Sequence, residues 1–247
     1  MAYRFAVTRE NHEDLSAGGV LFSAPGFPAF PVRLASEMFQ RAMASRASGV
    51  PALVWDPCCG SAYLLTVLAL LHRDGMTGVM GTDLDDAALE LARQNLDLLG
   101  PGGLSARSAQ LQERAARFGK PSYARAAESA LRLGDRLAAL GGPLPRAVAH
   151  ADVFDPERLR RALDGRRPDV VITDVPYGEQ TAWSGTDADA GLAGMLCSVS
   201  SVLDDDAVIV IATRGRRVLV DEAHPRIASF RVGTRAVALF RASSRRG

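Results

Sequence analysis

Four short apolar runs in this chain each end in an aspartate, and segments with helical patterns separate them. The runs span residues 52–56, 78–83, 146–152 and 169–174. Short strands that alternate with helices predict βαβ units and a parallel sheet. Because the carboxyl ends of parallel strands lie along one edge, we expect the four aspartates to share one rim of the sheet. Open α/β sheets bind their ligands at that rim.

Three further apolar runs complete the predicted sheet. One spans residues 207–212, and two more, at about 227–232 and 236–241, flank Gly233-Thr234 and indicate a hairpin. The prediction is therefore an α/β fold with a mostly parallel seven-stranded sheet and a C-terminal antiparallel hairpin. This is the pattern of Rossmann-like class I methyltransferases.

The length of 247 residues fits one α/β domain with additions. An extension and a helix, residues 1–48, precede the first strand. The stretch at about 101–145 has the pattern of two helices, and a parallel sheet does not need so much chain between strands. We therefore predict a single domain over residues 1–247 with a helical insertion.

The bulk composition excludes several classes of protein. The formal net charge is +1, so the overall charge does not indicate a polyanionic partner. Cys58, Cys59 and Cys197 form no Cys-x-x-Cys or Cys/His cluster, so no zinc site is expected. The apolar run at residues 64–71 is too short for a membrane span, and the charged N-terminus does not resemble a signal peptide. We expect a cytoplasmic monomer with no metal site and no membrane partner.

The first predicted strand continues into a turn of small residues, Asp56-Pro57-Cys58-Cys59-Gly60-Ser61-Ala62. Small residues let the backbone approach a ligand, and the next helix presents free N–H groups there. A dinucleotide fold has Gly-x-Gly-x-x-Gly here to admit a pyrophosphate. An aspartate would repel a pyrophosphate but suits the ammonium group of S-adenosylmethionine. The alternative is an ordinary tight turn between a strand and a helix.

The next two strand ends extend this predicted donor site. Asp83 is placed to accept both ribose hydroxyls, and Asp152 to accept from the adenine amino group, while Leu84 or Val153 packs against the ring. A lone aspartate after a strand is more often a turn or cap residue, which is the alternative for each. The predicted cofactor-binding residues are Asp56, Pro57, Cys58, Gly60, Ser61, Asp83, Leu84, Asp152 and Val153.

The fourth strand ends in Asp174-Val175-Pro176-Tyr177, which resembles the Asp/Asn-Pro-Pro-Tyr motif of methyltransferases that act on nitrogens of planar bases. Asp174 and a carbonyl held by the Pro176 turn would accept hydrogen bonds from the target N–H. Tyr177 would stack on the flipped base. We predict these three as the catalytic residues, with no covalent nucleophile or metal. The alternative is a buried strand followed by a turn without chemistry.

The predicted insertion is rich in basic residues: Arg107, Arg114, Arg117, Lys120, Arg125, Arg132 and Arg136. Its apolar positions recur at helical spacing and should face the core, which directs most of the arginines outward. A basic helical flap beside the active site would contact backbone phosphates; a solvated helix face is the alternative. Arg214 and Arg216 follow a strand end and are further candidates. The predicted RNA-binding residues are Arg114, Arg117, Lys120, Arg125, Arg132, Arg214 and Arg216.

One segment before the first helix leaves two interpretations open. Residues 23–31, with Phe27 and Phe30, either close over the donor or the target, or pack on the following helix as a hydrophobic staple.

The chain as a whole resembles the avilamycin-resistance 23S rRNA guanine methyltransferases of the AviRa type, over nearly its full length. The stretches that carry the resemblance are residues 23–35, 55–61, 63–68, 117–123, 151–156 and 174–179. Residues 23–35 and 117–123 are not general methyltransferase motifs, which makes the resemblance specific. It implies S-adenosylmethionine-dependent methylation of a guanine nitrogen in large-subunit rRNA, and resistance to orthosomycin antibiotics such as avilamycin.

Two positions depart from the related sequences. Ala62 stands where many relatives have a second glycine, and Val175 stands where the wider base-methylating group has a first proline. The choice between N1 and N2 as the target nitrogen therefore stays open. A DNA or small-molecule N-methyltransferase, and a catalytically silent module that binds S-adenosylmethionine and RNA, are the alternative functions.

Overall fold

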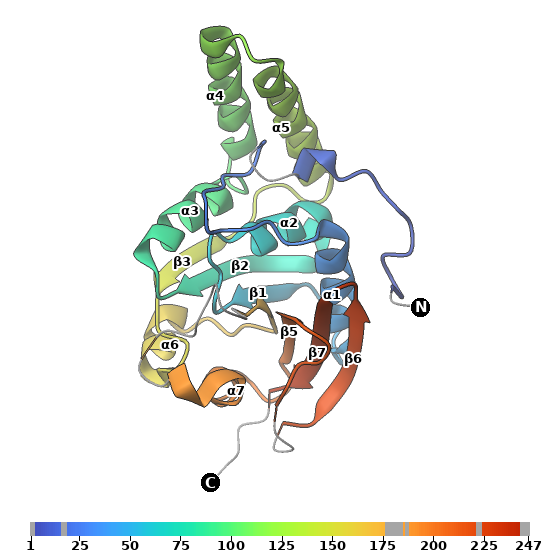
Figure 1. Ribbon diagram of the computed structural model, residues 1–247, viewed down its shortest axis with the longest axis vertical. Coiled ribbons are helices and arrows are strands. Elements are labelled where there is room, and N and C mark those ends of the chain that lie inside the picture. Colours follow the sequence, from blue (N-terminus) through green and yellow to red (C-terminus); the bar gives the residue numbers. More distant parts are fainter. Residues whose placement is uncertain (1–2, 16–18, 176–184, 186–187, 221–223, 243–247) are drawn as a thin grey trace.

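The computed structural model describes the chain except for residues 1–2, 16–18, 176–184, 186–187, 221–223 and 243–247. A seven-stranded sheet with the order β3-β2-β1-β4-β5-β7-β6 forms its centre (Figure 1). The first five strands pair in parallel, and β7 pairs antiparallel with both β5 and β6. The predicted fold class is confirmed. The strands are β1 Ala52–Asp56, β2 Met76–Asp83, β3 Arg146–His150, β4 Val170–Asp174, β5 Val208–Arg214, β6 Arg226–Val232 and β7 Arg235–Arg241.

Helices cover both faces of the sheet, with α1, α2 and α3 on one side and α6 and α7 on the other (Figure 1). Each face has its own cluster of buried apolar side chains. The helices are α1 Val32–Ser45, α2 Tyr63–His72, α3 Asp86–Asp97, α4 Gly103–Phe118, α5 Pro121–Ala139, α6 Pro156–Leu163 and α7 Gly191–Ser200. Short 3-10 turns lie at η1 Glu13–Leu15, η2 Arg73–Gly75 and η3 Ala188–Ala190.

The central strands are apolar on both faces because both faces are covered. In β4, Ile172 belongs to the cluster under α1 to α3, while its neighbour Val171 belongs to the cluster under α6 and α7. Trp55 of β1 is fully buried, and its indole N–H donates to the Thr82 hydroxyl at 3.1 Å. This packing fixes the position of β1, whose carboxyl end leads into the turn at residues 56–62, called the donor turn below.

Most predicted element ends agree with the structure to within two residues. Asp85 caps α3 by accepting from the Ala87 N–H, and Asp155 caps α6. One small difference matters for the site: β3 ends at His150, so Asp152 lies in the loop beyond the strand and not at its last residue.

The predicted insertion is an antiparallel pair of helices, α4 and α5, that projects from the body of the domain (Figure 1). Arg107 is an exception to the expectation that its arginines face solvent. Its guanidinium is buried, donates to the Val20 carbonyl at 2.8 Å and stacks on Phe22 at 4.0 Å. Arg107 therefore joins the base of the hairpin to the N-terminal segment. No helix among the described residues has the length and apolar character to cross a bilayer.

Candidate active site

The carboxyl edge of the sheet carries side chains sorted by the sign of their charge. In the order of the strands, β2, β1 and β4 end in Asp83, Asp56 and Asp174. Next along the edge, β5 ends in Arg214. β7 runs in the opposite direction, so its first residue, Arg235, pairs with Arg214 at the same edge. The rim thus passes from three carboxylates to two guanidinium groups.

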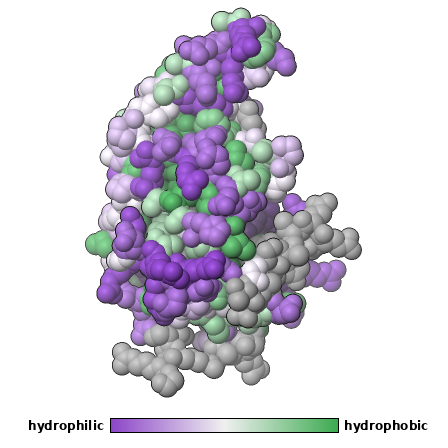
Figure 2. All heavy atoms as spheres, turned by 90° about the vertical axis from the view of Figure 1, so that its left-hand side faces the viewer, coloured by the Kyte–Doolittle hydropathy of each residue, from purple (hydrophilic) through white to green (hydrophobic). Residues whose placement is uncertain are grey.

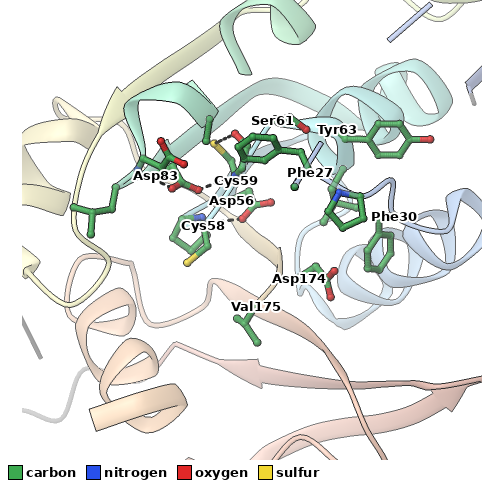
Figure 3. Close-up of a pocket in the computed structure, with 18 of the residues that line it drawn as sticks. Phe27, Phe30, Asp56, Cys58, Cys59, Ser61, Tyr63, Asp83, Asp174 and Val175 are labelled. Carbon is green, nitrogen blue, oxygen red and sulfur yellow. Dashed lines mark hydrogen bonds between the residues drawn. The ribbon is translucent and has the colours of Figure 1, made fainter. Parts of the chain in front are cut away.

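A cavity of about 1230 Å³ opens at this rim, and all five of these charged residues line it. The segment from Ala24 to Phe30 forms part of the facing wall. Figure 3 shows Asp56, Asp83 and Asp174 around the same cavity, with the Phe27 and Phe30 rings beside them. The sequence predicts that aspartates at the strand ends share one rim, and these three aspartates do.

Two of the aspartates hold the turn after β1 in shape. Asp83 Oδ2 accepts from the Gly60 N–H at 2.7 Å, and Asp56 Oδ1 accepts from the Cys58 N–H at 3.1 Å. Gly60 has a φ of 52°, which glycine adopts without strain. A Cβ at this position would come no closer than 3.8 Å to Phe27, so the backbone faces open space. The turn is an open cradle in which a ligand can approach the main chain.

Asp56 is the most strongly perturbed carboxyl group of the cavity. Its side chain is only 2% exposed, and burial raises its pKa to about 7, with the nearby carboxylates Asp83 and Asp174 adding to the effect. Charging Asp56 in the ligand-free protein is therefore costly, and a cation in the cavity would reverse that cost. The donor set and the open cradle fit a ligand that carries an ammonium or a sulfonium group.

Eight of the nine predicted cofactor-binding residues line the cavity: Asp56, Pro57, Cys58, Gly60, Ser61, Asp83, Leu84 and Val153. Asp152 is not among the lining residues. It is 2% exposed, and its Oδ1 accepts from the Phe154 N–H at 2.9 Å. Gly185 lies against it, since a Cβ there would come within 2.5 Å of Oδ1. The adenine contact of Asp152 stays a prediction.

Asp174 marks the border between the two signs of charge. It forms an ion pair with the Nη1 of Arg235, which is 8% exposed and whose guanidinium lies 4.6 Å from the centre of the Phe30 ring. Burial raises the pKa of Asp174, and the charge of Arg235 acts against that rise. Asp174 lines the cavity, and its catalytic role stays a prediction. Pro176 and Tyr177 lie outside the described residues, so their roles remain predictions.

Arg235 was not among the site residues predicted from the sequence. The signal was available in the hairpin, because a strand that returns antiparallel after Gly233-Thr234 must begin at the edge where β5 ends. The first residue of that strand therefore lies on the rim. Because more than sixty positions separate Arg235 from Asp174 in the sequence, no local pattern links the two residues.

The N-terminal segment is tied to the donor turn by one side chain of α3. Asn95 Oδ1 accepts from the Phe22 N–H at 2.8 Å, and its Nδ2 donates to the Ser61 carbonyl at 2.9 Å. Phe30 is buried, and Phe27 lines the cavity. Both interpretations of residues 23–31 are compatible with this path, because Phe30 also belongs to the buried cluster that contains Leu34 of α1.

The predicted RNA-binding residues fall into two groups. Arg114, Arg117, Lys120, Arg125 and Arg132 are exposed on the α4–α5 hairpin, which contributes none of the described cavity-lining residues. The hairpin is therefore a projecting arm, and the expected flap beside the active site is not observed (Figure 1). Figure 2 shows hydrophilic side chains over much of this projection.

At the tip of the arm, Phe118 is 52% exposed and lies beside Tyr123, and the Arg117 guanidinium lies 5.2 Å from the centre of the Phe118 ring. Arg132 is partly neutralised by an ion pair with Asp14 at 2.6 Å. The tip thus combines cations with exposed aromatic surface.

The second group lies at the C-terminal half of the sheet. Arg214 lines the main cavity, whereas Arg216 lines a smaller one of about 410 Å³. Three further arginines line that smaller cavity: Arg217, Arg226 and Arg231. Within the described ranges, no group of three or more His, Cys, Asp or Glu side chains is arranged to hold a metal ion.

Comparison with known proteins gives consistent matches. The family model described as rRNA methyltransferase AviRa matches residues 1–235. A 23S rRNA (guanine(2535)-N(1))-methyltransferase from Streptomyces viridochromogenes is 52% identical over 242 residues, which cover 98% of this chain and 96% of the relative. Two solved structures of the rRNA methyltransferase AviRa from the same organism, at 2.4 and 1.5 Å, match with a TM-score of 0.92 and 51% identity, over 99% of this chain and 98% of theirs.

Proposed function

This chain belongs to the family of AviRa rRNA methyltransferases, and we propose that it transfers a methyl group from S-adenosylmethionine to N1 of a guanine in 23S rRNA. The observation that carries the proposal is the sorted rim: carboxylates suit a cationic donor, and the adjoining arginines suit an RNA acceptor. The choice of N1 rests on the activity of the 52% identical relative from Streptomyces viridochromogenes. Resistance to orthosomycin antibiotics such as avilamycin is part of the same proposal.

On the donor side, S-adenosylmethionine would supply an activated methyl group on a positively charged sulfur. We assign its cationic groups to the end of the cavity beside Asp56, and its ribose hydroxyls to Asp83. Leu84 and Val153 would pack against the adenine, with Asp152 as its hydrogen-bond acceptor. The fit is supported by the desolvated carboxyl group of Asp56 and by the open backbone at Gly60.

On the acceptor side, Asp174 would accept from the N–H of the target base. The cavity position of Asp174 supports this role. The assignment of Pro176 and Tyr177 to holding and stacking the base rests on the motif alone.

We assign contact with the RNA backbone to the projecting arm, through Arg114, Arg117, Lys120, Arg125 and Arg132, and to Arg214 and Arg216. The exposed cations and the exposed Phe118 ring at the tip support this assignment. A single chain supplies both sides of the cavity, which supports action as a monomer. Its proposed substrate would place it in the cytoplasm.

The test is incubation of the purified protein with S-adenosylmethionine and 23S rRNA, followed by primer extension and mass spectrometry. A methyl group at N1 blocks base pairing, so we expect a strong reverse-transcription stop at one guanine and a matching mass increase in one fragment. DNA and free guanosine serve as competing acceptors. Equal or faster methylation of either one, or transfer to N2 without a stop, would contradict the proposal.

A further inference from the structure

We propose that Arg235 is the residue that recognises the target base as guanine, by donating to its O6 while Asp174 accepts from its N1–H. The inference rests on the proposed function. In this proposal the Asp174–Arg235 pair selects guanine over other bases. It also stabilises the negative charge that develops when N1 loses its proton.

The position of Arg235 is the first support. It is the first residue of β7, lies on the rim two strands away from β4, and still reaches Asp174 across the end of β5. The guanidinium is largely buried, and Phe30 covers one of its faces. Burying an arginine is costly unless it has a defined partner, so its place on the cavity wall is specific.

The hydrogen bonds of Arg235 are the second support. Its Nη1 donates to Asp174 Oδ1, and within the described part of the chain Nε and Nη2 have no acceptor. A guanidinium has five N–H donors in a fixed plane, so donors remain for a ligand. Arg235 lines the cavity together with Asp174 and Val175, so donors that have no acceptor among the described residues belong to a side chain of the cavity wall.

The edge of guanine complements this pair. Guanine presents the O6 acceptor directly beside the N1–H donor, and arginine is the side chain that most often contacts O6. A carboxylate and a guanidinium in contact offer an acceptor and a donor side by side, in the matching order. Adenine has an amino donor at position 6 and an unprotonated N1, so both contacts would become unfavourable.

The same contact assists the reaction. The Asp174 carboxylate takes the N1 proton, and the electron pair stays on the base, shared between N1 and O6. That pair forms the bond to the methyl carbon, and the pair of the broken carbon–sulfur bond stays on sulfur, which becomes neutral. Arg235 stabilises the negative charge on O6 before the new bond forms. The burial that raises the pKa of Asp174 favours its uptake of a proton.

The experiment compares RNA fragments that carry either guanine or 6-thioguanine at the target position. Sulfur accepts hydrogen bonds weakly but leaves the N1–H in place. Binding is measured with S-adenosylhomocysteine present, so that no transfer occurs. We expect wild-type protein to bind the guanine fragment about 10-fold more tightly, and Arg235→Met to bind the two fragments equally. Arg235→Lys should restore part of the preference.

Rates give a second readout. The N1–H of 6-thioguanine is more acidic, so Arg235→Met should lose about 100-fold in kcat on guanine and much less on 6-thioguanine. Its kcat on guanine should also rise with pH more steeply than that of the wild type. The matched control is Arg241→Met at the opposite end of β7, where the Arg241 side chain donates to the Asp206 and Ser45 carbonyls.

Two outcomes overturn the inference. Either Arg235→Met keeps the wild-type preference for guanine, or it slows both substrates equally with an unchanged pH profile, as a residue that only holds Asp174 would do. Failure of the proposed function looks different, since the wild-type protein itself would then leave the guanine of 23S rRNA unmodified.

Discussion

The two sides of the cavity differ in charge and in where the sequence encodes them. The donor side is built from the ends of β1 and β2, close together in the chain, and its carboxylates bind their own backbone turn. The acceptor side joins β4 to the C-terminal hairpin, and its charges bind one another. In the proposed function, the first side holds a small cation, and the second presents an intact acceptor–donor pair to a base. Asp174 belongs to both sides.

Replacing this border residue should have the largest effect. Asp174→Ala is expected to lower the rate of methyl transfer at least about 1000-fold, because the base loses its proton acceptor. Donor affinity should change less than about threefold, because Asp56 and Asp83 remain. Titration calorimetry with S-adenosylmethionine and a tritium-transfer assay on rRNA measure the two quantities.

Asp174→Asn is the control for folding, because its amide oxygen still accepts from Arg235. It should fold like the wild type and remain inactive. A large loss of donor affinity in either variant would show that the two sides of the cavity are not separable.

Removing the charge of Asp56 should weaken the donor side alone. Asp56→Asn keeps an acceptor for the Cys58 N–H but loses its attraction for a cation, so donor affinity at pH 8 should fall about 10- to 100-fold. Because the pKa of Asp56 lies at about 7, the donor affinity of the wild type should also fall as pH drops through 7. Calorimetry across pH 6–8 measures both; a pH-independent affinity would contradict the assignment.

The same variant should be more stable than the wild type without ligand. The folded state raises the pKa of Asp56 from 3.8 to about 7, so the wild type loses stability as pH rises between these values, and the loss is complete above 7. At pH 8 we expect Asp56→Asn to gain about 2–4 kcal/mol in unfolding free energy. Urea denaturation at pH 8 and pH 5 should show the gain shrinking at the lower pH. An equal gain in unfolding free energy at both pH values would mean that the charge of Asp56 is not its cause.

The proposed contact of the projecting arm with RNA can be tested apart from the cavity. Changing Arg117, Lys120 and Arg125 to glutamine together should weaken RNA binding about 10-fold and lower the salt slope by about 2–3, with donor affinity unchanged.

A matched triple variant of Arg93, Arg158 and Arg160 removes the same charge from arginines that pair with acids on their own helix or its cap. It should bind RNA nearly as the wild type does. Equal losses in the two triples would mean that net charge, and not the arm, governs RNA affinity.

The smallest effect is expected at Ala62. Its φ of 53° is costly for alanine, and Ala62→Gly relieves that cost. Glycine gains freedom in the unfolded chain and loses a buried methyl group, so the net change in unfolding free energy should stay within about 1 kcal/mol. Denaturant titration measures it, and donor affinity should not change. A donor affinity several-fold higher in the variant would indicate that the methyl group narrows the cradle.

The parts of the fold that follow from local pattern were predictable from the sequence. The strands and the turn after Asp56 depend on neighbours within a few residues, and the structure agrees with them. Asp174 was identifiable because its motif carries its chemistry in consecutive residues.

What escaped prediction depends on contacts between distant segments. Arg107 looked like a surface cation until the Val20 carbonyl, 87 positions away, proved to be its partner. Arg235 acquires its position from strand order, which no local pattern records. Asp152 lies two residues beyond the end of β3, and it is not among the cavity-lining residues although Ala151 and Val153 are.

The hydrogen bonds that Asn95 makes to Phe22 and Ser61 bear on the order in which the nascent chain folds. Residues 22–30 leave the ribosome long before α3, yet their place beside the cradle depends on a side chain of that helix. The facing wall of the cavity can therefore assemble only after more than a third of the chain has emerged. A nascent chain shorter than that has the sequence of the donor turn but cannot yet enclose a ligand.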